Sequence, residues 1–228
     1  MENEKEVTMK LSFKRILSAA WKLFVKDPRN LYYPLRYWRH FLSGIYLFNG
    51  NKIFKHRTAR IEQGGGRILF GNIQHPFRVP PGFIRLQENA KLIITGDVAM
   101  ADGVMIELGP GATLEIGGNT YINANTMIGV KESIRIGRNC AISGEVGIMD
   151  TDVHFILDLK GNKMTATAPI EIGDHVWIGA RCTILKGSRI DSGAVVGATS
   201  LVTGHVHAKS VSCASSCQEV RRNVEWIL

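Results

Sequence analysis

An aliphatic residue returns at every sixth position along one long stretch of this chain, and this period restricts the fold more than any other feature. Between Ile170 and Val206 these positions are Ile172, Ile178, Ile184, Ile190, Val196 and Val202. A small or β-branched residue follows four places after each, at Val176, Cys182, Ser188, Ala194, Ser200 and Val206. A period of six is compatible with strand alternation but not with a helix, whose period is near 3.6.

The same repeat extends toward the N-terminus with changes of register. Its aliphatic positions are Ile116, Ile122 and Ile128, then Ile136, Ile142 and Ile148, with a noisier run at Ile94, Met100 and Ile106. The shifts by two residues at Leu114/Ile116 and Ile134/Ile136 are expected if some coils carry two extra residues at a corner. Hexapeptide repeats of this kind indicate a parallel β-helix, in which stacked coils bury columns of like side chains. We predict an all-β domain over residues 58–208 and a tail over 209–228.

Most of the positive charge lies before this domain. The chain of 228 residues has a formal net charge of +8, and residues 1–60 hold thirteen Lys and Arg against four Asp and Glu. Apolar residues there fall on one helical face, at Phe13, Ile16, Leu17, Ala20, Leu23 and Phe24. We therefore predict that residues 1–57 form a basic, amphipathic helical extension.

The extension has two interpretations. Its basic, aromatic helix could lie on an anionic membrane surface through residues 1–50, or it could pack on its own domain or on a partner subunit. No apolar run is long enough for a spanning helix, and no signal peptide is visible, so we expect a cytoplasmic protein, peripheral to the inner membrane face if the first interpretation holds. The main fold lacks basic clusters interleaved with aromatics, so we expect no nucleic-acid partner.

The repeat is interrupted between Ile148 and Ile170, where we predict an outward loop over residues 149–169. The loop begins with Asp150, Asp152 and His154 at alternate positions. Loops on rigid scaffolds often carry chemistry, and carboxylates beside an imidazole form an acid/base set. A carboxylate bonded to one ring nitrogen would fix the tautomer of the imidazole.

These motifs together resemble the hexapeptide-repeat acyltransferases, and within them the sugar and polysaccharide O-acetyltransferases. The matching segments are DTDVH and VWIGARCTILKGSRIDSGAVVGATSLVTGHV, and the resemblance covers roughly residues 58–222. It implies a left-handed β-helix, a homotrimer with active sites in the clefts between subunits, and acetyl-coenzyme A as the donor. It also implies that His154 is the general base, oriented by Asp152 or, as the second choice, by Asp150.

The resemblance further implies a donor site. Backbone groups at Gly179, Ala180, Gly197 and Ala198 would bind the pantetheine arm, with Thr203 further along and Trp177 at the subunit cleft. Two segments depart from the pattern of the family. Where the family has threonine-lysine-aspartate, this chain has Thr203-Gly204-His205, and where the family has glycine-asparagine-proline-alanine, it has Ala214-Ser215-Ser216-Cys217. Both would touch the outer end of the coenzyme, so the phosphate contacts of the family are not carried over to these residues.

The cysteines and histidines show no spacing typical of a metal-binding site. Cys140 and Cys182 occupy small inward positions, and Cys213 and Cys217 have no second pair to complete a zinc site. A zinc carbonic anhydrase on this fold would need three histidines, whereas only His154 lies in a suitable loop. His175, His205 and His207 are scattered on outward positions, so we predict no metal.

We predict transfer of an acetyl group from acetyl-coenzyme A to a hydroxyl of a sugar or surface-glycan precursor. The alternatives are N-acetylation of an amino sugar, acylation of a small molecule such as an antibiotic, and a trimeric scaffold without catalytic activity. Retention of the His154 loop beside both donor signatures argues against the scaffold.

Overall fold

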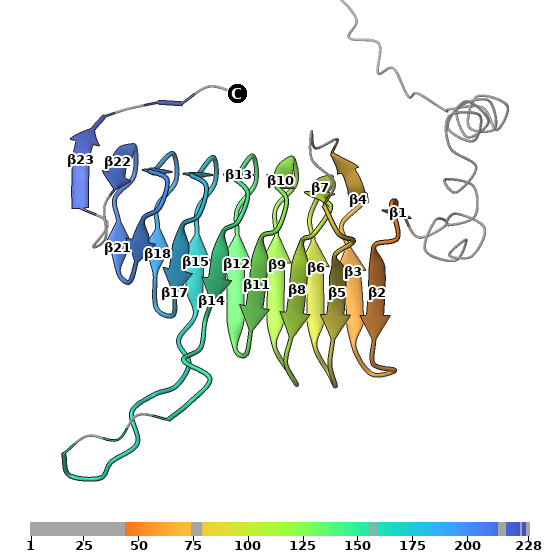
Figure 1. Cartoon of the computed structure of the whole chain (residues 1–228), viewed down its shortest axis with the longest axis horizontal. Coiled ribbons are helices and arrows are strands. Elements are labelled where there is room, and N and C mark those ends of the chain that lie inside the picture. Colours follow the sequence, from red (N-terminus) through yellow and green to blue (C-terminus); the bar gives the residue numbers. More distant parts are fainter. Residues whose placement is uncertain are drawn as a thin grey trace, which may run out of the picture.

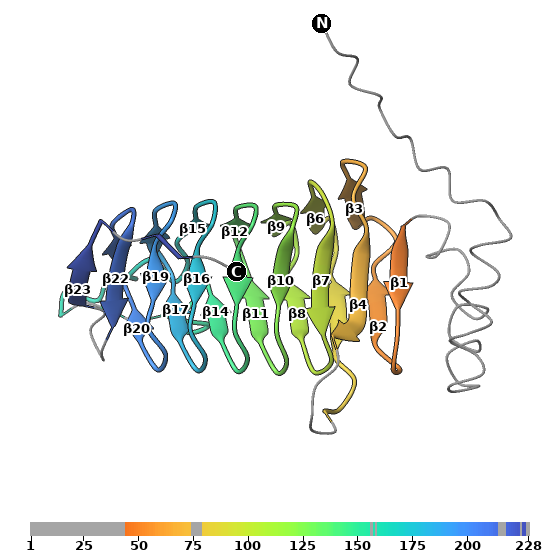
Figure 2. The ribbon, with the colours of Figure 1, turned by 90° about the horizontal axis from the view of Figure 1, so that it is seen from above.

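A computed structural model describes residues 44–73, 79–155, 157, 159–213, 218–223, 225 and 226. These residues form a left-handed parallel β-helix whose coils stack along one long axis (Figures 1 and 2). Each coil contributes one short strand to each of three sheets. The predicted all-β fold is therefore confirmed, whereas the predicted helix of the N-terminal extension lies outside the described residues.

The first sheet, sheet A, has nine strands. In spatial order they are β1 (Ile45–Leu47), β4 (Ile68–Ile73), β7 (Val98–Ala101), β10 (Thr120–Ile122), β13 (Ala141–Ile142), β16 (Trp177–Ile178), β19 (Val195–Val196), β22 (Ser210–Cys213) and β23 (Gln218–Arg222). All neighbours pair in parallel except β22 and β23, which are antiparallel. The strand β23 therefore covers the edge of β22, which would otherwise expose unpaired backbone groups.

The other two sheets have seven strands each. Sheet B contains β2 (Lys52–Lys55), β5 (Phe83–Leu86), β8 (Met105–Leu108), β11 (Met127–Val130), β14 (Gly147–Met149), β17 (Thr183–Leu185) and β20 (Leu201–Val202). Sheet C contains β3 (Arg60–Gln63), β6 (Lys91–Ile94), β9 (Thr113–Ile116), β12 (Ser133–Ile136), β15 (Ile170–Ile172), β18 (Arg189–Ile190) and β21 (His205–Val206).

The core is made of the columns that the period predicts. All the aliphatic positions from Ile172 to Val202 are at most 1% exposed, and so are the small positions from Val176 to Ser200. Like residues stack in register, for example Ile148 on Ile184 and Ile184 on Val202. Cys140 and Cys182 are buried free thiols, as predicted. Burial of these columns supplies the main stabilising free energy, because each aliphatic side chain contributes about 1.5–3 kcal/mol when it leaves water.

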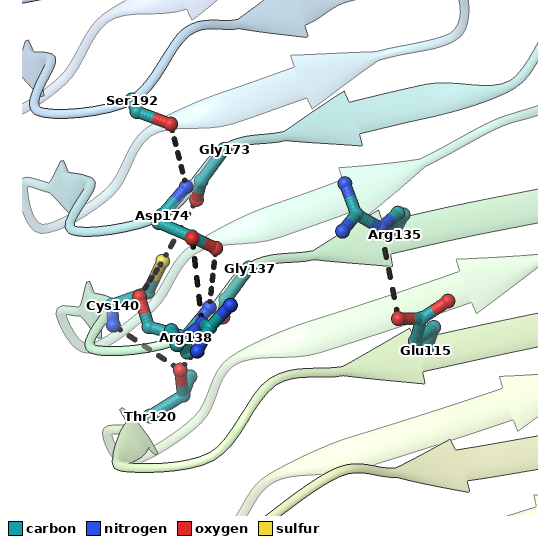
Figure 3. Close-up of polar contacts among 9 residues, drawn as sticks. All are labelled: Glu115, Thr120, Arg135, Gly137, Arg138, Cys140, Gly173, Asp174 and Ser192. Carbon is teal, nitrogen blue, oxygen red and sulfur yellow. Dashed lines mark hydrogen bonds and ion pairs between the residues drawn. The ribbon is translucent and has the colours of Figure 1, made fainter.

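The corners between sheets C and A are stacked through polar groups as well (Figure 3). The Asp174 carboxylate accepts the N–H of Arg138 at 3.0 Å, and Ser192 Oγ accepts the N–H of Asp174 at 3.0 Å. Inside the same corner, the Cys140 thiol donates to Gly173 O at 3.2 Å. Three consecutive coils are thus tied together at their turns, which makes the prism a rigid support.

The predicted domain boundaries need correction at both ends. Strands β1 and β2 pair in parallel with β4 and β5, so the stack already includes Ile45, ahead of residue 58. Strand β22 pairs in parallel with β19, so the stack also continues past residue 208, to Cys213. The coils at both ends could not be recognised from the sequence because their inward positions do not keep the six-residue period.

One register prediction is also wrong. Val206 was assigned to the small inward position, but it pairs with Ile190 in sheet C and occupies the place of a large residue. Val206 follows the inward Val202 by four residues, whereas Ile190 follows the inward Ile184 by six, so the corner at Thr203 and Gly204 is two residues shorter than the equivalent corner one coil earlier. The coil is shortened at the segment where the chain departs from the pattern of the family.

Candidate active site

The loop that carries His154 leaves the β-helix between β14 and β15, at the corner where sheet B meets sheet C. Figure 1 shows it as an arm that projects from the stack. Isolated antiparallel bridges join Thr151 to Thr167 and Leu157 to Lys163. The arm is therefore a narrow hairpin, and its neck is fixed by the coils on either side.

Asp150 anchors the base of this arm to the preceding coil. Its side chain is 0% exposed, and its two carboxylate oxygens accept the N–H groups of Lys131 at 2.7 Å and Glu132 at 2.8 Å. Burial raises the pKa of Asp150, although these backbone hydrogen bonds act in the opposite direction. Its contacts give Asp150 a structural role and do not support its use to orient His154.

Lys186 closes the neck of the arm from the following coil. Its Nζ atom lies 2.5 Å from Oδ2 of Asp152 and donates to Thr165 O at 2.5 Å. The ammonium group thus joins both sides of the hairpin. The structure differs here from the prediction that the Asp152 carboxylate orients the His154 ring, because that carboxylate faces Lys186.

His154 stands on the outer side of this clamped neck. Its backbone N–H donates to Asp152 O at 2.7 Å, and its side chain is exposed. Val153, just before it, has φ of 65°, which is a strained value for a β-branched residue. Within the described part of the chain the His154 ring has no hydrogen bond or ion pair, and its side chain faces solvent.

The predicted donor residues Gly179, Ala180, Gly197 and Ala198 lie at a different corner, between sheets A and B. The two turns stack directly, since Thr199 N–H donates to Ala180 O at 2.8 Å. A Cβ atom on Gly179 would lie 2.5 Å from Ala198 N, and one on Gly197 would lie 2.7 Å from Cys213 Cβ. Coil stacking therefore requires both glycines, while Ala180 and Ala198 are exposed on the outside.

Trp177 lies on the outer face of β16, close to these turns. Its side chain is 42% exposed, as its outward position predicts, and its Nε1–H donates to Ser143 Oγ at 3.3 Å. Thr203 is exposed at the corner between sheets B and C, which is the corner that carries the loop. The predicted site residues thus occupy two corners of one prism.

Trp226 contributes to the same surface and was missed in the sequence. Its ring stacks on His175 with centroids 4.1 Å apart, its Nε1–H donates to His175 O at 2.7 Å, and its carbonyl accepts from His175 Nε2 at 2.9 Å. Its ring centroid lies 6.2 Å from that of Trp177. A lone tryptophan outside the repeat carried no sequence signal for this contact.

Comparison with known proteins agrees with the class that the fold and the motifs define. Residues 169–204 match the family described as bacterial transferase hexapeptide (six repeats). The chain is 32% identical over 111 residues to galactoside O-acetyltransferase of Escherichia coli (strain K12), covering 49% of this chain and 55% of that protein. It is 33% identical over 106 residues to polysialic acid O-acetyltransferase of Neisseria meningitidis, covering 46% of this chain and 49% of that protein. The chain thus spans about half the length of the curated relatives it matches.

A solved structure extends the similarity over a larger share of the chain. A crystallographically analysed polysialic acid O-acetyltransferase superposes with a TM-score of 0.61 at 25% identity, covering 78% of this chain and 88% of that one. These findings confirm the predicted resemblance to the hexapeptide-repeat acyltransferases. In the described part of the chain, no helix has the length and apolar character needed to cross a membrane.

Proposed function

We propose that this protein is an acetyltransferase that moves an acetyl group from acetyl-coenzyme A to a hydroxyl group of a sugar, in a surface polysaccharide or glycoconjugate precursor. The observation that carries the proposal is the His154 loop. It presents an exposed imidazole that has no hydrogen bond to the described residues, on a strained turn clamped to a rigid prism by Asp150 and Lys186. The similarity to sugar and polysaccharide O-acetyltransferases supports the choice of a glycan acceptor.

In the proposed reaction, His154 removes the proton from the acceptor hydroxyl while that oxygen attacks the thioester carbonyl. The tetrahedral intermediate then collapses, the carbon–sulfur bond breaks, and the imidazolium returns the proton to the leaving thiolate. General-base catalysis of this kind contributes about 10²–10⁴-fold. A backbone N–H of the coil wall would stabilise the oxyanion.

The donor would lie along the stacked turns at Gly179, Ala180, Gly197 and Ala198, beside Trp177, and its outer part would extend toward Thr203 at the next corner. At Ala180 and Ala198, which are exposed, the side chain is only a methyl group, so an amide-rich linear arm could approach the backbone there. The reaction needs no metal in this scheme.

We propose that the active site is completed between subunits of a homotrimer. The loop leaves one corner of the prism and most donor residues lie at another, so the loop of one subunit would meet the donor turns of its neighbour. Exposed apolar side chains on the arm would be covered in such a cleft; they are Val153, Phe155, Leu157, Leu159 and Met164.

We also propose that the basic N-terminal residues 1–50 bring a cytoplasmic enzyme to the inner membrane face. The proposal rests on their charge and aromatic content. Liposome binding by the full chain and by a chain that lacks residues 1–43 would test it, with weaker binding expected for the truncated chain. Equal binding would favour packing on the trimer.

The test of the proposed activity is incubation of the purified full chain with labelled acetyl-coenzyme A and an acceptor panel. The panel should contain nucleotide sugars, glycans, lipid-linked saccharides, amino sugars and aminoglycosides. We expect label on a sugar hydroxyl. Label found only on nitrogen would indicate an N-acyltransferase instead. Absence of label on every acceptor would contradict the proposed activity and favour a trimeric scaffold without catalysis.

A further inference from the structure

Three side chains gather on the outer face of sheet C, away from His154 and from the turns at Gly179 and Ala198. Asp191, His205 and His207 place their ligand atoms within 4.8 Å of one another. Oδ2 of Asp191 lies 2.7 Å from Nε2 of His205, and the His205 and His207 ring centroids are 4.4 Å apart. We propose that these three side chains bind a divalent transition-metal ion of the zinc type.

The backbone explains why the three residues meet. His205 and His207 flank Val206, which points into the core and is 2% exposed, so strand alternation puts both imidazoles on the outer face. Ile190 pairs with Val206, and Asp191 N–H donates to Val206 O at 3.0 Å. Asp191 and His207 are therefore neighbours on consecutive coils.

This juxtaposition depends on the shortened corner at Thr203 and Gly204. With a corner of the usual length, residue 191 would lie beside residue 209, and the two histidines would be displaced from the carboxylate. The sequence alone therefore shows two scattered histidines, whereas the register brings them together. The prediction of no metal rested on that scattered placement, and the proposal made here departs from it.

The ligand types suit a transition metal. Imidazole and carboxylate groups bind zinc tetrahedrally at about 2.0–2.2 Å, so two ligand atoms on one ion lie about 3.3–3.6 Å apart. The imidazoles are exposed and can rotate, so a small change in side-chain torsion closes the cluster around an ion. Calcium and magnesium prefer sites made only of oxygen atoms, which this cluster is not.

A charge network without a metal explains only part of the arrangement. Arg189 Nε donates to Oδ1 of Asp191 at 2.9 Å, and His205 bonds to Oδ2. That network gives the His207 ring no polar partner among the described residues. With an ion present, Arg189 would hold one carboxylate oxygen while the other coordinates, which is a usual way to orient a metal ligand.

A bound ion would join the last coils of the stack. His205 lies in β21, His207 directly follows β21, and Asp191 directly follows β18, so coordination would fasten two consecutive coils near the C-terminal end. The site lies on a face distinct from the corner turns that hold Gly179 and Ala198. The inference therefore does not depend on the proposed acetyl transfer, and its expected effect is on stability.

The test is titration of metal-free full-length protein with zinc chloride by calorimetry. We expect one site per chain, and at least a tenfold loss of affinity at that site in His205→Ala and in His207→Ala. His56→Ala is the matched control, because His56 is also exposed but bonds to Thr58 Oγ1 at 2.9 Å and lies far along the chain. The control should bind like the wild type.

Thermal unfolding of the same variants provides a second readout. Zinc should raise the melting temperature of the wild type and of His56→Ala, and should leave that of His207→Ala unchanged. Equal melting temperatures of all variants without zinc would verify that they fold. Absence of stoichiometric binding, or binding unchanged in both His205→Ala and His207→Ala, would overturn the proposal.

Discussion

Lys186 and Asp152 form an ion pair, with Nζ 2.5 Å from Oδ2, across the neck of the loop that carries His154. Their side chains are 26% and 32% exposed, so the pair is partly shielded from water. Lys186 also bonds to Thr165 O on the opposite side of the hairpin. Position 186 is thus coupled to the loop through two contacts, although it lies on another coil.

Replacing Lys186 with Met should remove both contacts and loosen the neck. We expect kcat for acetyl transfer to fall by up to about 100-fold, since a misplacement near 1 Å can cost that much. KM for acetyl-coenzyme A should change little, because the donor turns lie at another corner. Lys186→Arg, which keeps the charge, should recover part of the rate.

Limited proteolysis of the loop gives a readout for Lys186 that does not require activity. The Met variant should be cleaved faster between residues 150 and 169 than the wild type, and the Arg variant should lie between them. If Lys186→Met were cleaved at the same rate as the wild type and kept its kcat, Lys186 would not position the loop.

Gly179→Ala should destabilise the protein by about 1–3 kcal/mol, the usual cost of overpacking. The added Cβ would lie 2.5 Å from Ala198 N, on a backbone that the next coil fixes. Gly147→Ala is the matched control, since a Cβ there meets nothing within 4 Å and the φ of Gly147 is ordinary. Urea unfolding should separate the two variants, and equal stability would show that coil stacking does not require Gly179.

Trp226→Ala should also reduce the free energy of unfolding, by about 3 kcal/mol. The indole is only 9% exposed and stacks on His175, so its loss uncovers part of sheet A. Trp226→Phe keeps an aromatic ring but loses the bond to His175 O, and should cost about 1 kcal/mol. Urea unfolding that is unchanged in Trp226→Ala would show that this contact does not stabilise the stack.

Cys140 should make stability depend on alkaline pH. Burial raises the pKa of the Cys140 thiol to about 11, whereas a thiol in the unfolded chain ionises near about pH 8.5. The unfolded chain alone loses the proton between these values. The stabilisation is therefore fully present below the lower pKa and declines by up to about 1.4 kcal/mol per pH unit above it.

Cys140→Ala measures this contribution, because alanine fills the equivalent inward position at Ala194. The stability difference between wild type and variant should shrink as pH rises from about 8 to about 10.5. Cys213→Ala, at a half-exposed position on β22, is the control for general alkaline effects. A difference that stays constant with pH would contradict the pKa assigned to Cys140.

The columns of the β-helix could be predicted from the sequence because residues six positions apart take equivalent inward places on the coil. Ile172, Ile184 and Val202 are buried, as their six-residue spacing predicts. The loop could be located in the same way, since the repeat stops at Ile148 and resumes at Ile170.

Contacts between coils could not be predicted with the same success. The pairing of Asp152 with Lys186 depends on how residues 34 positions apart meet at one corner, and no local pattern encodes it. Val206 was misassigned because a two-residue shortening at Thr203 and Gly204 changes the register without interrupting the alternation. Trp226 lies outside the repeat, so its position depends on tertiary packing alone.

The central claim is that the His154 imidazole acts as the base in acetyl transfer. The most direct measurement is turnover of His154→Ala with labelled acetyl-coenzyme A, together with its melting temperature and its affinity for the coenzyme. The account predicts that folding and coenzyme binding persist while kcat falls at least about 100-fold. A folded variant with the wild-type rate would contradict it.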